Sequence, residues 1–326
     1  MHPAMATVVS SAAQAESSST VVHCYDFFDR VFPECGIFDY TEGIYHGDAA
    51  TEYEQAQRNQ HTWLLDAAGC TAGSRLLDIG CGKGTLHTEA RERGAEAVGI
   101  TISPAQVKRG AEMGRDIRLH NYRNLGEEWN GRFDCVVANG SAEHFVQQSV
   151  VLAGRADELY EEFFATCHRV LDPRSASQRL VTTIIHTNEH TPPLTAEERL
   201  AAPWAFPWFS LKFHYALVQR GFGGNYPDPG QLERCARRYF QLVEEVDGTH
   251  DYHLTSEAWF RRVKRSLLHW RRGPRIAAGL AGLFLRQPRQ TATLVFGLLV
   301  AESWQRQFRG PTPPTTLLRQ VWRRIP

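Results

Sequence analysis

Two short apolar runs with a helix-like stretch between them form the clearest pattern in the chain. The run LLDI at Leu76–Ile79 predicts a buried strand, and AVGITI at Ala97–Ile102 predicts a second one. Between them, Thr85–Arg93 has the pattern of a helix that Gly94 ends, and Glu52–Ala67 predicts another helix before the first strand. Strand, loop, helix and strand in this order form a βαβ unit, so we expect a parallel sheet with right-handed crossovers.

A glycine-rich loop joins the first predicted strand to its helix, within RLLDIGCGKG at Arg75–Gly84. Gly80, Gly82 and Gly84 allow a tight turn and a close approach of the backbone to a ligand. No Gly-Lys-Ser/Thr follows, which excludes a P-loop, and the sixth-position glycine of the dinucleotide fingerprint is absent. The loop by itself predicts only a nucleotide-type ligand, and an ordinary glycine-rich turn is the alternative.

Composition changes this picture only in part. With 326 residues and 42% hydrophobic content, the chain can bury a real core in one large or two small domains. Acidic and basic residues number 36 each, which argues against nucleic-acid binding by general charge. The charge is uneven, however, because Arg261–Arg324 is rich in arginine.

Cysteine use and the absence of targeting signals indicate a cytoplasmic protein. The seven cysteines include no close Cys-x-x-Cys pair, which favours reduced thiols over a disulfide framework. Residues 1–20 are mostly Ala, Ser, Thr and Val, and we expect a disordered leader there instead of a signal peptide. The apolar runs Ile276–Leu285 and Thr291–Ala301 are each too short to span a bilayer, so no transmembrane segment is predicted.

Asp78, directly before the first glycine, narrows the ligand. The pattern D-x-G-x-G-x-G at the end of a first strand resembles motif I of class I methyltransferases, which bind S-adenosylmethionine. In that family the loop backbone approaches the methionyl part of the cofactor, with the acid nearby. The second strand does not end in the acid that often binds ribose hydroxyls. The end of this second strand, Gly99–Gln106 (GITISPAQ), resembles the corresponding stretch of cyclopropane-fatty-acid synthases and mycolic-acid methyltransferases. These enzymes form a lipid-modifying branch of the class.

The resemblance to this branch continues along the chain, from about Tyr25 to Trp322. It covers a third strand with Asn121 where an acid is more usual, a fourth strand followed by a Glu-His pair, and a fifth strand with a histidine near its end. A proline- and glycine-rich turn, a segment with a tyrosine near a tryptophan, and a closing helix and strand follow. The corresponding stretches are Asp116–Leu125, Phe133–Phe145, Leu180–His190, Asn225–Cys235, Gly248–Trp259 and Trp304–Trp322.

The resemblance implies an α/β, Rossmann-like class I methyltransferase fold. It predicts a mostly parallel seven-stranded sheet with helices on both faces and an aromatic-rich helical cap. After the leader we expect a single domain at 21–326, with four parts. These are N-terminal helices and an active-site loop (21–70), a cofactor-binding core (71–190), a substrate cap and late core (191–275), and C-terminal helices with a final strand (276–326).

The resemblance also implies which residues bind S-adenosylmethionine. They lie in the loop before the first predicted helix, in the glycine loop, and just after the next three strands. The implied cofactor-binding residues are Tyr40, Thr41, Asp78, Gly80, Gly82, Gly84, Thr101, Ile102, Ser103, Gln106, Asn121, Tyr122, Arg123, Asn139 and Gly140.

For catalysis, the resembled enzymes use a bound bicarbonate as base, held by a glutamate, a histidine, a tyrosine, a cysteine and a backbone group. The first three carry over to Glu143, His186 and Tyr252. The cysteine does not, because Thr41-Glu42 occupies its place, and two carboxylates disfavour an anion between them. The chain thus departs from bicarbonate, and the open alternatives are Glu143 or Glu42 as base, or a substrate that needs another proton acceptor.

Each candidate also has a structural interpretation. Glu143-His144 fits a helix N-terminus, His186 a hydrogen-bonded histidine at a strand end, Tyr252 a packing residue, and Glu42 a surface acid. Because Glu143 and His186 both follow predicted parallel strands, where ligands of open α/β sheets collect, the catalytic interpretation is favoured. A zinc site that uses His186, His190 and a cysteine lacks metal-site spacing, so we predict no metal.

An aromatic segment follows the fifth predicted strand. In the resembled enzymes insertions at this place line an apolar tunnel, which would suit an acyl or isoprenoid chain and stabilise a developing cation. A plain hydrophobic core of the cap is the alternative. The predicted lining residues are Trp204, Phe206, Trp208, Phe209, Phe213, Tyr215 and Phe222.

The arginines near the C-terminus flank apolar helical runs. This combination suits anionic phospholipid headgroups or a diphosphate, and hence a peripheral contact with the inner membrane face. A charged outer face on amphipathic core helices is the alternative. The arginine-rich stretch is Arg261–Arg289.

The primary hypothesis is an S-adenosylmethionine-dependent C-methyltransferase of the cyclopropane-synthase type. It would methylate an alkene in an apolar unsaturated substrate, a fatty-acyl lipid or an isoprenoid, and remove a proton from the resulting carbocation. An O- or N-methyltransferase of a small aromatic or secondary metabolite is one alternative, and a lipid-binding protein on a decayed scaffold is another. The product (cyclopropane, methyl branch or methylene), the base, the substrate and the oligomeric state, a homodimer included, stay open.

Overall fold

A single seven-stranded sheet organises residues 20–326, the part of the chain that the computed structural model describes. The predicted leader comprises residues 1–20, and all but the last of these lie outside the described part. The strand order is β3-β2-β1-β4-β5-β7-β6; β1 to β5 run parallel, and β7 is antiparallel to both β5 and β6. The strands are β1 (Arg75–Ile79), β2 (Glu96–Thr101), β3 (Asp116–Leu119), β4 (Cys135–Asn139), β5 (Arg179–Thr187), β6 (Phe240–Asp247) and β7 (Thr315–Arg324).

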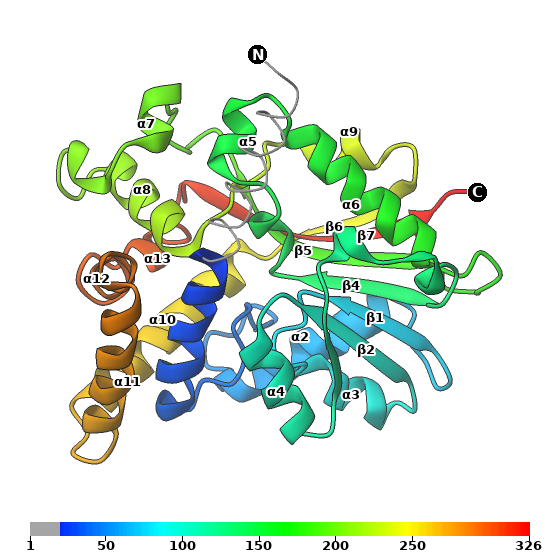
Figure 1. Cartoon of the computed structure of the whole chain (residues 1–326), viewed down its shortest axis with the longest axis horizontal. Coiled ribbons are helices and arrows are strands. Elements are labelled where there is room, and N and C mark those ends of the chain that lie inside the picture. Colours follow the sequence, from blue (N-terminus) through cyan, green and yellow to red (C-terminus); the bar gives the residue numbers. More distant parts are fainter. Residues whose placement is uncertain (1–19) are drawn as a thin grey trace.

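Helices cover both faces of this sheet (Figure 1). Residues 20–31 are helical and precede the short turn η1 (Pro33–Cys35). The α-helices that follow are α2 (Tyr53–Ala67), α3 (Leu86–Glu92), α4 (Pro104–Glu112), α5 (Gln148–Leu152), α6 (Ala156–Val170), α7 (Ala196–Leu200), α8 (Leu211–Phe222), α9 (Gln231–Ala236), α10 (Thr249–Leu267), α11 (Arg272–Arg286), α12 (Pro288–Val295) and α13 (Ser303–Arg306). Short turns of other helical types are η2 (Tyr122–Asn124), η3 (Glu127–Trp129), η4 (Ala142–His144), η5 (Pro203–Ala205) and the π-helical η6 (Phe296–Val300).

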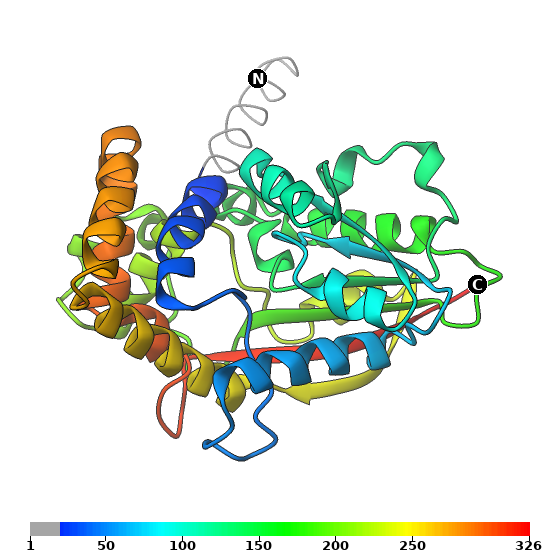
Figure 2. The same ribbon diagram turned by 90° about the horizontal axis from the view of Figure 1, so that it is seen from below.

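The period-two alternation of the strands divides the core between the two faces. Leu77 belongs to the core under α6 together with Phe163, whereas its neighbour Leu76 belongs to the core under α2 together with Leu64. Figure 2, viewed from below, shows α2 lying along the sheet. Because both faces are covered, the central strands β1 and β4 are almost entirely buried, as expected of parallel strands.

A third body of apolar packing forms the helical cap. Residues 20–31 and helices α8 and α10 to α13 share one aromatic-rich cluster, which also contains Ile185 near the end of β5 and Leu317 near the start of β7. These two residues join the cap to the edge of the sheet where the parallel strands end. The predicted fold class, with an aromatic helical cap, is confirmed. Among residues 20–326, no helix is both long and apolar enough to cross a membrane.

The third strand is shorter than the stretch that the resemblance assigned to it. β3 ends at Leu119 instead of Leu125, and η2 follows at once. The physical reason is Asn121, whose side-chain oxygen accepts a hydrogen bond from the backbone N–H of Arg123 at 3.1 Å and so caps the turn.

Gly80 is required where β1 leaves the sheet. Its φ is +77°, and a Cβ there would lie 2.4 Å from the Cβ of Ser141. Gly131 has a similar φ of +61° but open space around it. We expect Gly80→Ala to lower the free energy of unfolding by about 3 kcal/mol or more, against about 1 kcal/mol for Gly131→Ala, because only the former adds a clash to the strain of a positive φ. Urea denaturation measures both, and equal losses would contradict the steric explanation.

Candidate active site at the carboxyl edge of the sheet

Of the three glycines in the loop, Gly82 is the one least crowded by the rest of the protein. The N–H groups of Gly80 and Cys81 both donate to the carbonyl of Ile100, at 2.9 and 3.2 Å, which fixes the turn against β2. At Gly82, with φ of +56°, a Cβ would have Nε2 of Gln106 as its nearest neighbour, 3.9 Å away. A ligand can therefore reach the backbone at Gly82. At Gly80 the Ser141 side chain occupies the space where a Cβ would lie.

The end of β2 forms a buried polar corner beside this loop. The Thr101 hydroxyl donates to Oε1 of Gln106 at 2.6 Å, and the Ser103 hydroxyl caps α4 by accepting from the Gln106 N–H at 3.4 Å. All three side chains are buried, whereas Ile102 is half-buried. Oε1 of Gln106 is thus occupied, and its Nε2 group is the one that faces the loop.

The three residues predicted after β3 divide into different environments. Asn121 is half-buried at the strand end, where it caps η2. The Tyr122 ring is buried against Phe145, with ring centres 4.5 Å apart, and Arg123 pairs with Glu162 at 2.9 Å. The structure therefore gives Tyr122 and Arg123 partners within the protein, and their predicted cofactor contacts stay predictions.

Asp39, which the sequence did not single out, holds the active-site loop in place. Its Oδ1 accepts from the N–H of Tyr40 at 2.8 Å and lies 3.0 Å from the Thr41 hydroxyl. Its Oδ2 lies 2.8 Å from Nε2 of His61 in α2 and accepts from the Thr85 hydroxyl at 2.7 Å. Despite burial, the His61 and hydroxyl partners hold the pKa of the Asp39 carboxyl below its usual range.

A second polar network connects the same loop to β4 and β5. The amide of Asn139 lies within hydrogen-bonding distance of Thr41 (3.2 Å) and of Gln60 in α2 (3.4 Å), and its Oδ1 accepts from Thr183 at 2.5 Å. The next residue, Gly140, has φ of +59°, and a Cβ there would lie 3.0 Å from the Thr41 side chain. Thr41, Asn139 and Gly140, predicted from separate segments, therefore meet at one place.

Glu143 is a buried carboxyl without a cationic partner among the described residues. It lies in η4, its Oε2 has no hydrogen bond there, and burial, with a smaller effect of Glu42, raises its pKa to about 8. Its backbone carbonyl accepts from the N–H of Asn225 at 2.9 Å, and a Cβ on Gly224 would lie 2.1 Å from that carbonyl oxygen. Glu143 does lie in the first turn of the three-residue η4, as the helix N-terminal interpretation expected, but its side chain is buried.

Tyrosines share this environment. Burial is the main cause that raises their pKa values, and the Glu143 charge adds to it in every case, so all stay neutral. They are Tyr25, Tyr160, Tyr226 and Tyr252. After burial, the charges of Glu42 and then Glu143 are the next causes that raise the pKa of Tyr252, and its implied catalytic role stays a prediction.

Glu42 is buried and has its own counter-ion. Its Oε1 accepts from Nε of Arg319 at 3.1 Å, and Nη2 of the same arginine binds Asp251 at 2.9 Å. Arg319 comes from β7, is 2% exposed, and was not foreseen from the sequence. The alternative of a surface acid at Glu42 is wrong, and the negative charge expected near the missing cysteine is balanced by a guanidinium.

His186 is buried and unpartnered. Neither ring nitrogen has a hydrogen bond within the described residues, and burial lowers its pKa to about 4, so the ring is neutral. The interpretation as a hydrogen-bonded strand-end histidine is therefore wrong. By strand alternation its side chain shares the sheet face of Ile184, opposite to that of Ile185. Between Thr20 and Pro326, no group of three or more His, Cys, Asp or Glu side chains could hold a metal ion.

The predicted substrate-lining residues separate into two groups. Phe206, Phe213, Tyr215 and Phe222 are buried in the cap, but Trp204, Trp208 and Phe209 are 69%, 65% and 51% exposed. The last three face solvent and do not line a tunnel in this structure.

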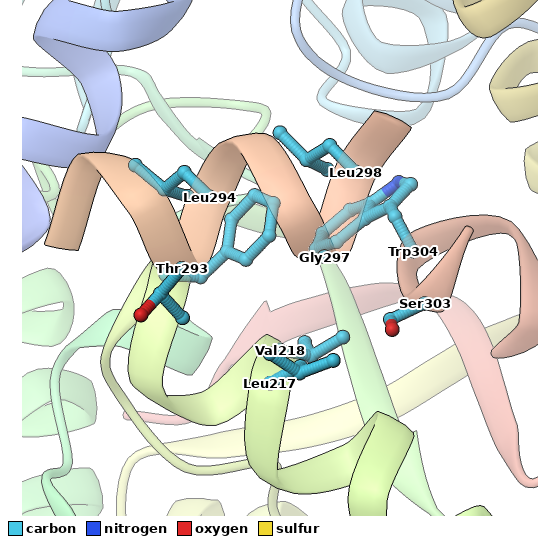
Figure 3. A pocket seen from close by; sticks show the side chains of 9 residues that line it. Leu217, Val218, Thr293, Leu294, Gly297, Leu298, Ser303 and Trp304 are labelled. Atoms are coloured by element: carbon cyan, nitrogen blue, oxygen red, sulfur yellow. The ribbon is translucent and has the colours of Figure 1, made fainter. Parts of the chain in front are cut away.

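A small apolar pocket, with a volume of about 10 Å³, lies between α8, α12, η6 and α13 (Figure 3). Leu217 and Val218 line it from α8, and Leu294 and Leu298 from the facing helical segment. Trp304 forms one wall, stacks on Phe222 at 4.2 Å, and contacts the Tyr252 ring edge-on at 5.8 Å. The Trp304 ring therefore lies between the pocket and the Tyr252 ring. Its full lining is Leu217, Val218, Phe222, Thr293, Leu294, Gly297, Leu298, Ser303 and Trp304.

Comparison with known families decides the relationship. The profile of the family described as mycolic acid cyclopropane synthetase matches residues 13–270. The chain belongs to this family. The sequence resemblance to cyclopropane synthases is thus confirmed.

Relatives within the cyclopropane synthase group are similar over part of their length. Cyclopropane mycolic acid synthase 2 from Mycobacterium leprae is 29% identical over 221 residues, which cover 63% of this chain and 66% of that protein. Cyclopropane-fatty-acyl-phospholipid synthase from Escherichia coli K12 is 27% identical over 243 residues, 73% of this chain and 53% of that protein. The chain thus spans less than two thirds of the length of these cyclopropane synthases.

Solved structures share the fold over nearly the whole chain. Mycolic acid cyclopropane synthase CmaA1 complexed with SAH and CTAB has a TM-score of 0.67 at 18% identity, covering 94% of this chain and 98% of that one. A geranyl diphosphate methyltransferase in complex with GPP and sinefungin has a TM-score of 0.60 at 19% identity, covering 95% and 100%. At these identities the likeness establishes the cyclopropane synthase fold alone.

Glu143→Gln should stabilise the protein at alkaline pH. Because the folded-state pKa of about 8 exceeds the ordinary value of 4.5, the wild-type protein loses stability as pH rises from 4.5 to about 8, and glutamine cannot ionise. We expect the variant to gain about 4 kcal/mol in unfolding free energy at pH 8 and little at pH 4.5. Urea denaturation across this pH range measures the effect, with Glu92→Gln, an exposed glutamate of α3, as the control. A difference between variant and wild type that does not change with pH would contradict the assignment.

Proposed function

We propose that this chain is an S-adenosylmethionine-dependent C-methyltransferase that methylates an alkene in an apolar lipid or isoprenoid substrate. The observation that carries the proposal is Glu143, a buried carboxyl whose Oε2 has no partner in the described part of the chain, set among tyrosines at the edge of the sheet that also carries the glycine loop. Membership of the cyclopropane synthetase family supports the same reaction class.

The chain's own residues fit the cofactor. The backbone at Gly82 is open to a ligand, and the Nε2 donor of Gln106 lies beside it. S-adenosylmethionine, when bound, supplies an electrophilic methyl group on a sulfonium. The Asp39 and Asn139 networks hold Tyr40 and Thr41 against this loop, so little reorganisation is needed on binding.

Glu143 is the base in this proposal. With a pKa of about 8, it is mostly protonated at neutral pH in the free protein. A cation that enters the buried site, such as a sulfonium, favours the carboxylate, so Glu143 releases its proton to solvent on binding. The carboxylate then accepts the proton that the substrate loses after methyl transfer. Glu42 is less suited, because Arg319 already occupies one of its oxygens.

The tyrosine rings stabilise the cationic stage. Aromatic faces attract a positive charge, most strongly where water is excluded. Tyr226 is held by a hydrogen bond from its hydroxyl to Gln307 at 2.7 Å, and the Tyr25 hydroxyl lies 3.0 Å from Nε2 of His144. Burial lowers the pKa of His144 to about 4, so this imidazole adds no competing charge.

An apolar substrate would extend from Tyr252 past Trp304 into the pocket of Figure 3. The pocket volume of about 10 Å³ is that of one water molecule, so the side chains that line it would have to move apart to admit a substrate segment. Whether the substrate carries a cyclopropane, a methyl branch or a methylene after reaction depends on which proton Glu143 removes.

Gly82→Val tests the cofactor site. We expect calorimetry to show S-adenosylhomocysteine binding to the wild-type protein and a loss of about 100-fold or more in the variant, because the side chain fills the approach to the loop and strains a positive φ. Gly114→Val, at φ of +67° with open space around it, is the matched control and should bind normally.

A second experiment tests the substrate class. Labelled-methyl transfer followed by mass spectrometry of host lipids should give acyl or isoprenyl chains enlarged by one methylene. An alkali-labile ester or an ether product would instead support the O-methyltransferase alternative.

We also propose that the protein works in the cytoplasm, in contact with an anionic membrane surface. All seven cysteines are unpaired, in keeping with a reducing compartment. Between Glu257 and Glu302 the chain has nine Lys and Arg residues and no acidic one. At the tip between α10 and α11, at the lower left of Figure 1, Leu268 and Trp270 are 90% and 72% exposed. Arginines flank an interfacial tryptophan here, a combination suited to anionic headgroups.

Cosedimentation with lipid vesicles tests this contact. Binding to vesicles that contain phosphatidylglycerol should exceed binding to pure phosphatidylcholine and should weaken in high salt. Replacing Arg271 and Arg272 by alanine should weaken binding roughly 10- to 30-fold, because each arginine near the surface contributes about 1 kcal/mol. Arg237 and Arg238, an exposed pair elsewhere, serve as the control. Equal losses from both pairs would contradict a specific docking tip.

A further inference from the structure

Lys83 places a buried ammonium in the middle of the glycine loop. The side chain is 8% exposed, and its Nζ donates to the Tyr40 hydroxyl at 3.0 Å. The same Nζ lies 4.4 Å from the centre of the Tyr40 ring. Tyr40 in turn donates from its hydroxyl to Oδ1 of Asp29 at 2.6 Å. The lysine thus joins a chain of three groups from three segments: the N-terminal helix, the active-site loop and the glycine loop.

The ammonium is only partly satisfied by the protein. It has three protons to donate, and within the described residues the Tyr40 hydroxyl is the acceptor it reaches. No carboxylate of residues 20–326 lies within ion-pair distance of it; Asp29 is reached through Tyr40. Burial lowers the pKa of Lys83, which shows that the cation lacks a full substitute for water. A buried cation of this kind is costly unless an anion completes its shell.

Hydrogen bonds fix both the backbone of Lys83 and the tyrosine that its ammonium group contacts. Its backbone carbonyl accepts from Nη1 of Arg115 at 2.7 Å, and Gly82 beside it is open to a ligand. The Tyr40 hydroxyl is held on one side by Asp29, so it cannot turn away from the ammonium without losing that bond. The Lys83 protons that Tyr40 does not accept are available to an anion bound close to this loop.

S-adenosylmethionine has one anionic group, the carboxylate of its methionyl part; the adenosine part has none. We propose that Lys83 binds this carboxylate and, with Tyr40, acts as a positioning pair that orients the methionyl end of the cofactor. This inference rests on the proposed cofactor. It assigns to Lys83 a role in affinity and placement, and none in the transfer of the methyl group or the proton.

The test compares two ligands that differ in the carboxylate. S-adenosylhomocysteine carries the amino-acid group, whereas 5′-methylthioadenosine lacks it and keeps the nucleoside and sulfur. By calorimetry, Lys83→Met should weaken S-adenosylhomocysteine roughly 10- to 100-fold and leave methylthioadenosine within about threefold, because a charge-assisted hydrogen bond is lost for one ligand only. Lys83→Arg, which keeps the charge, should recover most of the affinity for S-adenosylhomocysteine.

Other outcomes overturn the inference in distinguishable ways. Equal weakening of both ligands in Lys83→Met would show that Lys83 only supports the loop, and unchanged affinity for both would show no role. Should Lys83→Met fail to fold, Tyr40→Phe replaces it, because it keeps the ring under the ammonium and removes the hydroxyl acceptor. This variant should also weaken S-adenosylhomocysteine more than methylthioadenosine, and equal weakening of both ligands would contradict the positioning pair. A wild-type protein that binds neither ligand would refute the proposed cofactor itself, and the Lys83 inference with it.

Discussion

The hydrogen bonds of Asp39 hold the candidate site together. One carboxylate accepts from the backbone of its own loop, from α2 through His61, and from the start of α3 through Thr85. The carboxylate stays ionised because its partners are donors in a buried setting. These hydrogen bonds, together with the packing of Tyr40 against Phe28 and Phe32, place the loop that carries Tyr40 and Thr41 relative to the glycine loop.

Two buried glutamates near this loop have opposite situations. Burial raises the pKa of both carboxyls, but at Glu42 the Arg319 guanidinium opposes this effect. Glu143 has no cationic partner within residues 20–326 and, with a pKa of about 8, keeps a proton at neutral pH. The two glutamates therefore have different roles, one structural and one chemical. The first acid joins β7 to the active-site loop, and the second remains free to change its protonation state when a positive charge arrives.

Local features were predictable from the sequence, and long-range pairings were not. The glycine loop, α2 and the βαβ unit depend on residues close to one another in the chain, so spacing reveals them. Glu42 and Arg319 are 277 residues apart, and nothing local in TTLLRQVW shows what the arginine would meet, although a charge inside a buried strand was a usable signal. The exposed Trp204 and Trp208 illustrate the converse: composition placed them with the cap, but burial depends on how α8 packs.

The close contact of Gly224 with η4 has a mechanical consequence. A glycine lies so near the Glu143 carbonyl that no side chain fits, and the next N–H is hydrogen-bonded to that carbonyl. The turn that carries the carboxyl and the segment that carries Tyr226 are thus one rigid unit. A motion of the cap that admits or releases a bulky molecule must therefore leave the contact between Gly224 and η4 intact. The cap has to separate from the sheet at a different contact.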